Sequence, residues 1–282
     1  MTDRDERMAF DCVTVIEREQ KPRSRGITYA RDRGMGLQTL DAALEGCGEY
    51  VDILKLAGFG ARLQSRELIR RKVEMCRQAK VEVGLGGAIG EIALLQGPKT
   101  MVAYLQEARD LGIVYVEICR AVAIVSISHL IDLISVATEL GLKPIAEVGV
   151  AYGISADEKI FVDETKLLGT MRRFLDAGAH KILLESEGIT ESRNKADYRW
   201  DVISKVANTF PLESTMFEAD DPEVYTRYIR DYGPDVNLFV DISRVLPLEG
   251  ARRGGWGMHP VVNRVATFYR PEREVRAASK RR

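Results

Sequence analysis

Charged side chains recur in this sequence where short apolar segments end. Lys55 follows the run VDIL, and four glutamates close later runs of the same kind: Glu117, Glu147, Glu185 and Glu218. Carboxylates without accompanying His or Cys ligands suit a hard cation, Mg²⁺ above all. A lysine among carboxylates can act as a point charge, a proton donor or a Schiff-base amine. For each of these residues taken alone, a structural ion pair is the competing interpretation.

Smaller polar or flexible residues stand at the ends of the remaining segments. Asp32 follows the first apolar run, the third run leads into Gly86 and Gly87, and Asn237 lies in the last, which Asp241 follows. Polar groups in apolar strands are costly unless they are paired or solvated. Because so many occur at the same end of successive segments, we interpret them as the lining of one shared cavity.

A repeated sequence pattern predicts the helices and strands that position these residues. A helical pattern ends in glycine and a continuous apolar run follows at once, around Gly48, Gly112, Gly141, Gly178 and Gly233. Glycine can adopt the left-handed conformation that closes a helix, and unbroken Val/Ile/Leu runs indicate parallel strands buried on both faces. Eight strands are expected, at 26–31, 50–56, 81–85, 114–118, 144–148, 181–184, 214–217 and 236–240. Helical patterns between them include 37–45, 65–79, 101–111, 127–140, 164–177 and 222–232, with a last helix from about 247.

Eight such units in 282 residues predict an α/β fold, a single-domain (β/α)₈ barrel. A doubly wound open sheet is the alternative, which the lack of a G-x-G-x-x-G motif after the first strand disfavours. We expect an N-terminal extension at 1–20 that covers the barrel bottom, the barrel at 21–258 and a charged C-terminal tail at 259–282. The apolar residues between Val122 and Leu140 cover more than one helix face, which predicts burial against another subunit, and so a homo-oligomer, or against a terminal segment.

In a barrel the active site lies at the C-terminal ends of the strands, often with a phosphate site in the loops after strands seven and eight. Arg252 and Arg253 follow the eighth strand beside two glycines, and Arg23 belongs to the basic stretch KPRSRG. Guanidinium groups and glycine-rich turns are typical of anion-binding sites, although basic residues in loops more often face solvent without binding a ligand. The residues assigned to substrate binding are Arg23, Asp32, Gly86, Gly87, Asn237, Arg252 and Arg253.

Composition narrows the class of protein. Lys and Arg total 41 against 42 Asp and Glu, a net charge of −1, so a general nucleic-acid binder is not indicated. The four cysteines form no C-x-x-C pair and only three histidines are present, which disfavours a zinc site. The charged N-terminus lacks an apolar signal region, and the stretch from Ala121 to Leu140 is interrupted by polar residues as in an amphipathic helix. We expect a cytoplasmic protein that binds no membrane.

An ordered set of motifs carries a family resemblance. KPRSRGITYARDRGMG, VDILKLAGFG, GGAIGE, VEIC, IAEVG, ILLESEG, MFEA, VNLFVDI and LEGARRG span Lys21 to Trp256. In this order they resemble the phosphosulfolactate synthase (ComA) family. The resemblance implies a (β/α)₈ barrel and a lyase that adds sulfite to phosphoenolpyruvate with Mg²⁺ as cofactor. Together with the strand-end positions, this reaction leads us to predict catalytic roles for Lys55, Glu147 and Glu218, and the shared positions of Glu117, Glu147 and Glu185 predict metal ligands among them.

Two loops depart from the family pattern. Leu85-Gly86-Gly87-Ala88 stands where Pro-Gly-Gly-Thr is usual, and Cys119-Arg120-Ala121-Val122 replaces an Asp-Gly-Ser run. These changes leave three further hypotheses open: a related barrel enzyme with another small phosphorylated or carboxylated substrate, a non-catalytic or stress-associated barrel of the same family, and a Schiff-base aldolase that uses Lys55. The family also includes plant heat-stress-associated proteins.

Overall fold

The computed structural model describes residues 8–120, 125–149, 163–191 and 195–255. Its eight strands are β1 Thr28–Asp32, β2 Ile53–Leu56, β3 Glu82–Leu85, β4 Tyr115–Ile118, β5 Lys143–Val148, β6 Lys181–Leu184, β7 Thr215–Glu218 and β8 Leu238–Asp241. All neighbours pair in parallel, and β1 pairs with β8, so the sheet closes into a barrel. The predicted (β/α)₈ fold is confirmed.

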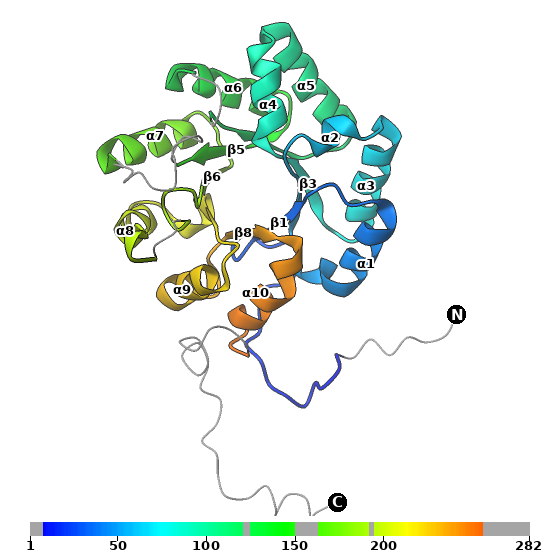
Figure 1. Cartoon of the computed structure of the whole chain (residues 1–282), viewed down its shortest axis with the longest axis vertical. Helices are drawn as coiled ribbons and strands as arrows, with labels where there is room; N and C mark the ends of the chain where they lie inside the picture. The colour runs from blue at the N-terminus through cyan, green and yellow to red at the C-terminus, as the bar shows by residue number, and fades with distance from the viewer. Residues whose placement is uncertain (1–7, 121–124, 150–162, 192–194, 256–282) are drawn as a thin grey trace, which may run out of the picture.

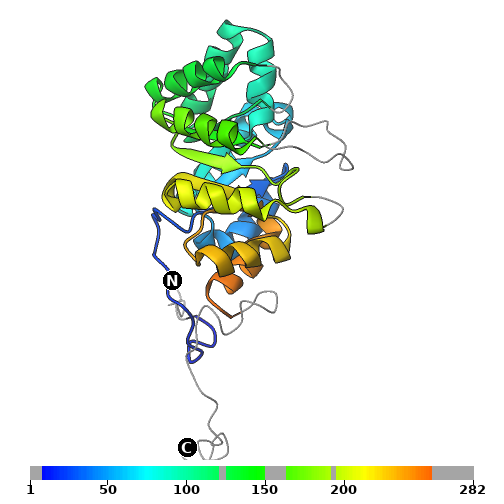
Figure 2. The same ribbon diagram turned by 90° about the vertical axis from the view of Figure 1, so that its left-hand side faces the viewer.

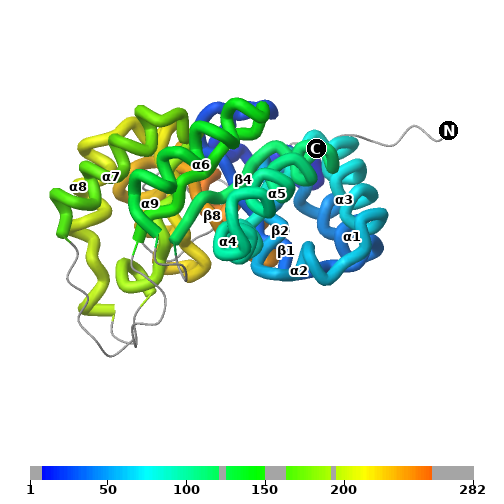
Figure 3. The backbone as a smooth tube through the Cα atoms, turned by 90° about the horizontal axis from the view of Figure 1, so that it is seen from above, coloured from blue at the N-terminus to red at the C-terminus, as the bar shows by residue number. Residues whose placement is uncertain are grey.

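Helices surround the barrel (Figure 1). Those of the described residues are α1 Leu37–Cys47, α2 Gly60–Leu63, α3 Arg66–Gln78, α4 Gly87–Leu95, α5 Pro98–Asp110, α6 Ile127–Glu139, α7 Glu164–Asp176, α8 Trp200–Thr209, α9 Pro222–Tyr232 and α10 Val245–Arg252. Short 3₁₀ turns lie at Gly48–Tyr50, Lys195–Asp197, Leu212–Ser214 and Ile242–Arg244. Neighbouring helices α1 and α3, and α4 and α5, pack side by side (Figures 1 and 3).

The predicted glycine breaks are confirmed at four of five positions. Gly112, Gly141, Gly178 and Gly233 have φ between 80° and 101°, the left-handed region that glycine enters without strain. Gly48 is the exception. Its φ is −57°, because a 3₁₀ turn over Gly48–Tyr50 continues the chain before β2.

Two layers of inward-facing residues define the barrel interior. The lower layer is a cluster of large apolar side chains, one from nearly every strand: Ile27, Tyr29, Ile53, Tyr115, Ile145, Leu183, Met216 and Phe239. Because side chains alternate along a strand, the residue two positions later faces the same side. Adding two to the seven positions that lie within strands, from Tyr29 onward, gives Arg31, Lys55, Glu117, Glu147, Glu185, Glu218 and Asp241. The strands therefore project a ring of charge above the apolar layer.

The N-terminal segment packs on the opposite end of the barrel. The Ile16 amide donates to the Arg253 carbonyl, and the buried Arg18 guanidinium pairs with Glu249. Figure 2 shows this blue segment at the same end of the molecule as the orange α10. Ile16 and Arg18 therefore contact α10, and the extension expected at 1–20 remains a prediction. The tail expected at 259–282 lies outside the described residues.

Helix α6 packs mainly within its own chain. Leu130, Leu133, Ile134 and Ala137 are buried against the barrel, whereas Ile127, Ile131 and Val136 are partly buried. Its apolar surface is therefore largely explained without a partner, and the homo-oligomer remains a prediction. Val122 and Ile124 lie outside the described residues. No helix of the described chain is long and apolar enough to cross a membrane.

Candidate active site

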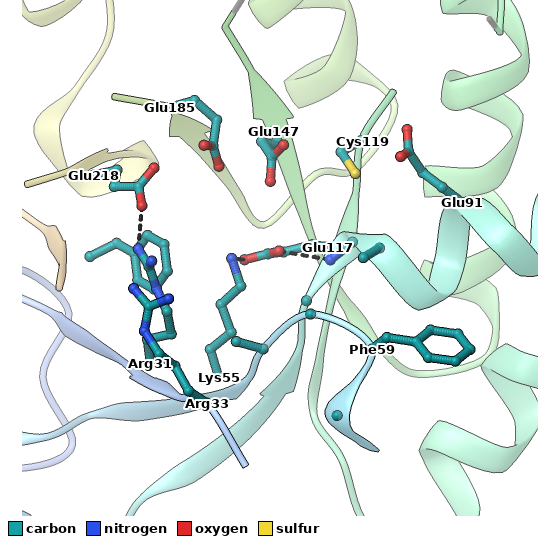
Figure 4. A pocket seen from close by; sticks show the side chains of 17 residues that line it. Arg31, Arg33, Lys55, Phe59, Glu91, Glu117, Cys119, Glu147, Glu185 and Glu218 are labelled. Carbon is teal, nitrogen blue, oxygen red and sulfur yellow. Dashed lines mark hydrogen bonds and ion pairs between the residues drawn. The ribbon is translucent and has the colours of Figure 1, made fainter. Parts of the chain in front are cut away.

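A pocket of about 620 Å³ opens at the C-terminal ends of the strands. Its charged lining has two sides (Figure 4). Arg31, Arg33 and Lys55 come from the β1 and β2 ends, and Glu117, Glu147, Glu185 and Glu218 come from β4 to β7. Positive charge therefore faces a row of carboxylates across one cavity.

Lys55 is fixed by Glu117. The Lys55 Nζ lies 2.7 Å from Glu117 Oε1, and the Tyr29 hydroxyl donates to the same oxygen at 3.0 Å. The other carboxylate oxygen accepts the Gly87 amide at 2.9 Å, at the start of α4. Lys55 and Glu117 are only 8% and 2% exposed. Because both oxygens of Glu117 already have protein partners, its evident role is to hold Lys55 rather than to remain open for a metal ion.

Lys55 remains protonated despite its burial. Burial alone would lower the pKa of its ammonium, but the negative charges of Glu117, Glu147 and Glu185 outweigh that effect and raise the pKa. Two aromatic rings add to this environment: Nζ lies 4.2 Å from the Phe239 ring centre and 5.8 Å from that of Tyr29. Attraction of a cation to an aromatic face favours the same charged state.

Glu147, Glu185 and Glu218 form a row of interacting carboxyl groups. Glu185 is hydrogen-bonded to both of the others. Burial and the charge of Glu117 raise the pKa of Glu147 to about 7, whereas burial and the charges of Glu147 and Glu218 raise that of Glu185 well above its usual value. Adjacent carboxylates resist ionising together. Without a further cation, this row therefore retains protons near neutral pH.

Glu218 is the ionised member of the row. Burial would raise its pKa, but the hydrogen bond from Glu185 and the positive charge of Arg31 lower it. Its carboxylate pairs with the Arg31 guanidinium, which also lies 3.1 Å from Asp220. Arg33 extends the rim, with its Nε 2.9 Å from Asp241. Glu218 thus holds Arg31 much as Glu117 holds Lys55.

The structure brings together part of the predicted substrate-binding set. Gly86 and Gly87 line the pocket. Asp32 does not, because it neighbours the inward-facing Arg31 and so faces outward, where it pairs with Lys72 on α3 at 2.8 Å. Asn237 lies two residues before the interior Phe239, and its amide binds the Leu212 and Thr215 carbonyls at the lower end of the barrel.

The predicted arginines also lie at the lower end. Arg23 pairs with Asp52 just before β2. Helix α10 starts after β8 and runs back along the barrel for eight residues, about 12 Å, so Arg252 and Arg253 at its end lie far from the pocket mouth. Arg252 donates to the Pro234 and Ile27 carbonyls, and Arg253 pairs with Glu249. The structure therefore does not bring these three arginines into the pocket, and their assignment to substrate binding gains no support from it.

Sequence reasoning missed several lining residues, namely Arg31, Arg33, Phe59, Glu91, Cys119 and Phe239. One signal was available for some of them. Arg31 and Arg33 follow Tyr29 at intervals of two, so they share its inward face if 26–31 is a strand. No local pattern marks Phe59, which precedes the four-residue helix α2.

Fold and site together define a (β/α)₈ barrel with a charged small-molecule pocket at the strand ends. The family model for (2R)-phospho-3-sulfolactate synthase (ComA) matches residues 16–258. A phosphosulfolactate synthase from Methanothermobacter thermautotrophicus is 32% identical, over 87% of this chain and 95% of the relative. The chain therefore belongs to the phosphosulfolactate synthase family.

Two further comparisons extend this relationship. The Arabidopsis thaliana protein HEAT-STRESS-ASSOCIATED 32 is 28% identical, over 84% of this chain and 88% of its own length. Among solved structures, 3-hexulose-6-phosphate synthase from Salmonella typhimurium superposes with a TM-score of 0.52. That match has 14% identity and covers 85% of this chain and all of the other, and it reflects the shared fold alone.

Proposed function

We propose that this protein catalyses the addition of sulfite to phosphoenolpyruvate, with Mg²⁺ as cofactor, to give phosphosulfolactate. Membership of the family supports the reaction class. The observation that carries the proposal is the buried, protonated Lys55, held by Glu117 opposite Glu147 and Glu185 in one pocket. This arrangement suits a reaction that builds negative charge on a substrate carboxylate and then delivers a proton to carbon.

Addition needs no covalent enzyme intermediate. The sulfite sulfur attacks the terminal vinyl carbon of phosphoenolpyruvate and forms the carbon–sulfur bond. The π electrons of the vinyl group move toward the carboxylate, which becomes an aci-carboxylate. The ammonium of Lys55 stabilises this charge and gives one proton to the carbon that bears the phosphate ester. Solvent then reprotonates the lysine, and no group leaves.

The carboxylates fit a hard divalent cation. Among the described residues no group of three or more His, Cys, Asp or Glu side chains is arranged as a metal site. Mg²⁺ commonly uses only one or two protein carboxylates and completes its shell with water and substrate oxygens. Glu147 and Glu185 would supply these two, since Glu117 is occupied by Lys55. The ion would replace the protons held by their carboxyl groups and offset the charge that develops on the substrate.

The geometry gives less support to a Schiff-base aldolase. A Schiff base forms from a neutral amine, and the carboxylates around Lys55 raise the pKa of its ammonium. The ion pair with Glu117 therefore favours the form that cannot attack a carbonyl. Borohydride trapping with a carbonyl substrate is expected to leave Lys55 unmodified.

A related addition with a different nucleophile is the second candidate. Ala88 and Cys119, which depart from the family pattern, both line the pocket. Cys119 is 6% exposed and lies against Gly87. An apolar methyl and a thiol in place of hydroxyl and carboxyl groups change how the pocket would receive the second substrate. Competition between sulfite and other small nucleophiles for phosphoenolpyruvate distinguishes the two candidates.

Product analysis tests the proposal. The full-length protein is incubated with phosphoenolpyruvate, sulfite and Mg²⁺, and the mixture is followed by ³¹P NMR and mass spectrometry. A new phosphate ester with the mass of phosphosulfolactate is expected, and EDTA should abolish its formation. Unchanged phosphoenolpyruvate at high enzyme concentration would refute the activity, whereas undiminished turnover in EDTA would refute only the metal dependence.

A further inference from the structure

Two cations share one aromatic ring at the floor of the pocket. The Arg31 Cζ lies 4.5 Å and the Lys55 Nζ 4.2 Å from the ring centre of Phe239, which is 1% exposed. Arg31 and Lys55 are also register partners on adjacent strands. Two like charges at such close quarters repel each other, and an aromatic face offsets part of that repulsion. The ion pairs with Glu218 and Glu117 offset more of it, and a bound anion would add to this effect.

Both cations retain donors that their carboxylate partners do not use. Nη2 of Arg31 makes the contacts with Glu218 and Asp220, and the buried Nε has no acceptor in the described part of the chain. The Lys55 ammonium carries three protons, one of which is directed to Glu117. A buried donor without an acceptor costs free energy, which a ligand can recover.

Arg33 adds a third positive charge at the mouth of the same pocket. Its side chain is 66% exposed, so it can turn toward a ligand more freely than Arg31, whose side chain is 15% exposed. Guanidinium groups bind phosphate through two parallel hydrogen bonds. Glu147 and Glu185 lie across the cavity and carry no positive charge that could hold an anion there.

We propose that Arg31 and Arg33 form a phosphate-monoester subsite beside Lys55 on the β1–β2 side of the pocket, which binds without a metal ion. The identity of the full substrate rests on the proposed function, whereas the anion chemistry rests on the residues themselves. The subsite places the phosphate ester at Arg31 and the substrate carboxylate near Lys55. The reacting carbons then face Glu147 and Glu185.

Binding of inorganic phosphate in EDTA tests the subsite without turnover. Isothermal titration calorimetry is run on the full-length protein, with circular dichroism to confirm folding. Arg31→Met keeps the aliphatic stem and removes the charge, so Kd should rise at least tenfold. Arg31→Lys keeps the charge without the planar fork and should give an intermediate Kd. Arg66→Met, which removes an exposed α3 arginine paired with Glu107, is the matched control and should leave Kd unchanged.

Phosphate that binds folded Arg31→Met or Arg31→Lys as tightly as it binds the unaltered protein would overturn the subsite. So would an unaltered protein that does not bind phosphate. Steady-state kinetics separate the two oxyanions of the reaction. Arg31→Lys should raise KM for phosphoenolpyruvate and leave KM for sulfite unchanged, and the reverse result would contradict the phosphate assignment.

The outcomes also separate this inference from the proposed function. Arg31-dependent phosphate binding in a protein that never consumes phosphoenolpyruvate with sulfite would support the subsite and refute the reaction. Normal turnover together with phosphate binding that is indifferent to Arg31 would support the reaction and refute the subsite.

Discussion

At the scale of single residues, the pocket is built from paired charges rather than isolated ones. Glu117 holds Lys55, and Glu218 holds Arg31, each through an ion pair in a largely buried setting. Glu147 and Glu185 have no cation in direct ion-pair contact among the described residues, and the pKa of each is raised. These two carboxyl groups are therefore where pH and metal ions should have their largest effect.

Glu147→Gln should stabilise the metal-free protein at pH 8 but not at pH 5. The folded pKa of Glu147, about 7, lies above that of an ordinary glutamate, so ionisation costs stability above pH 7. This cost disappears as the pH falls below the folded pKa. We expect a gain on the order of 1–3 kcal/mol at pH 8 in EDTA and little change at pH 5, measured by thermal denaturation.

The exposed Glu107, which pairs with Arg66, provides the control for that experiment. Glu107→Gln should shift Tm little, and equally at both pH values, because exposed pairs contribute little to stability. Equal shifts for Glu147→Gln at pH 5 and pH 8 would show that Glu147 titrates like an ordinary surface carboxylate.

At the scale of strands and helices, periodicity predicted much of the site. The apolar runs located all eight strands, and the glutamates at their ends did meet in one pocket. Asp32 shows the limit. Arg31 and Asp32 are neighbours on β1, so their side chains point to opposite faces of the strand. The sequence alone did not show which of these two faces points into the barrel. Helix α4 was also missed, since its sequence GAIGEIALL is apolar with two glycines and lacks a clear helical pattern.

The junction of β4 and α4 is tightly packed, which gives a prediction for Gly87→Ala. An added Cβ would lie 2.2 Å from the Cys119 Sγ, so α4 or β4 must move. Overpacking of this kind costs about 1–3 kcal/mol, and the shift should also weaken the Glu117 contact with the Gly87 amide. Cys119→Ala in the same chain should recover part of this loss, because the remaining Cβ contact is 3.3 Å.

Urea denaturation of Gly87→Ala, Cys119→Ala and the double variant measures this coupling. A favourable interaction energy between the two substitutions is expected. Strict additivity of the two effects would mean that the clash is relieved elsewhere and that Cys119 does not constrain the start of α4.

At the scale of the whole molecule, the two ends of the barrel have different tasks. The C-terminal ends of the strands carry the pocket, and the opposite end carries buried arginines that tie the N-terminal segment to α10 and to the start of β2. Basic motifs at both chain ends suggested a phosphate site from sequence. Helix α10 runs from the pocket end of the barrel toward the opposite end, so the arginines at its end lie far from the pocket. Composition does not reveal this direction.

Removal of residues 1–20 should therefore lower stability without altering the pocket. The deletion eliminates Arg18, a buried partner of Glu249, and the Ile16 contacts with Arg253. We expect a loss of about 1–3 kcal/mol, because Arg253 still neutralises Glu249, and an unchanged KM for substrate. Removal of residues 1–14, which spares both contacts, is the control. Full stability of the longer deletion would show that this segment only rests on the surface.

The central claim is that Lys55 acts on the substrate rather than only balancing Glu117. Lys55→Met alone leaves a buried carboxylate unpaired, so its effect on activity could arise from poor folding. The double variant Lys55→Met/Glu117→Gln removes both charges and keeps most of the packing. It should fold, with circular dichroism and urea stability close to those of the unaltered protein.

The decisive measurement is kcat for sulfite addition to phosphoenolpyruvate by this folded double variant, compared with Glu117→Gln alone. If Lys55 donates the proton, kcat of the double variant should fall about 10²-fold or more, in the range that general acid catalysis contributes. Glu117→Gln, which retains Lys55, should lose much less. Equal turnover by the two folded variants would exclude Lys55 from the reaction and leave it as a structural partner of Glu117.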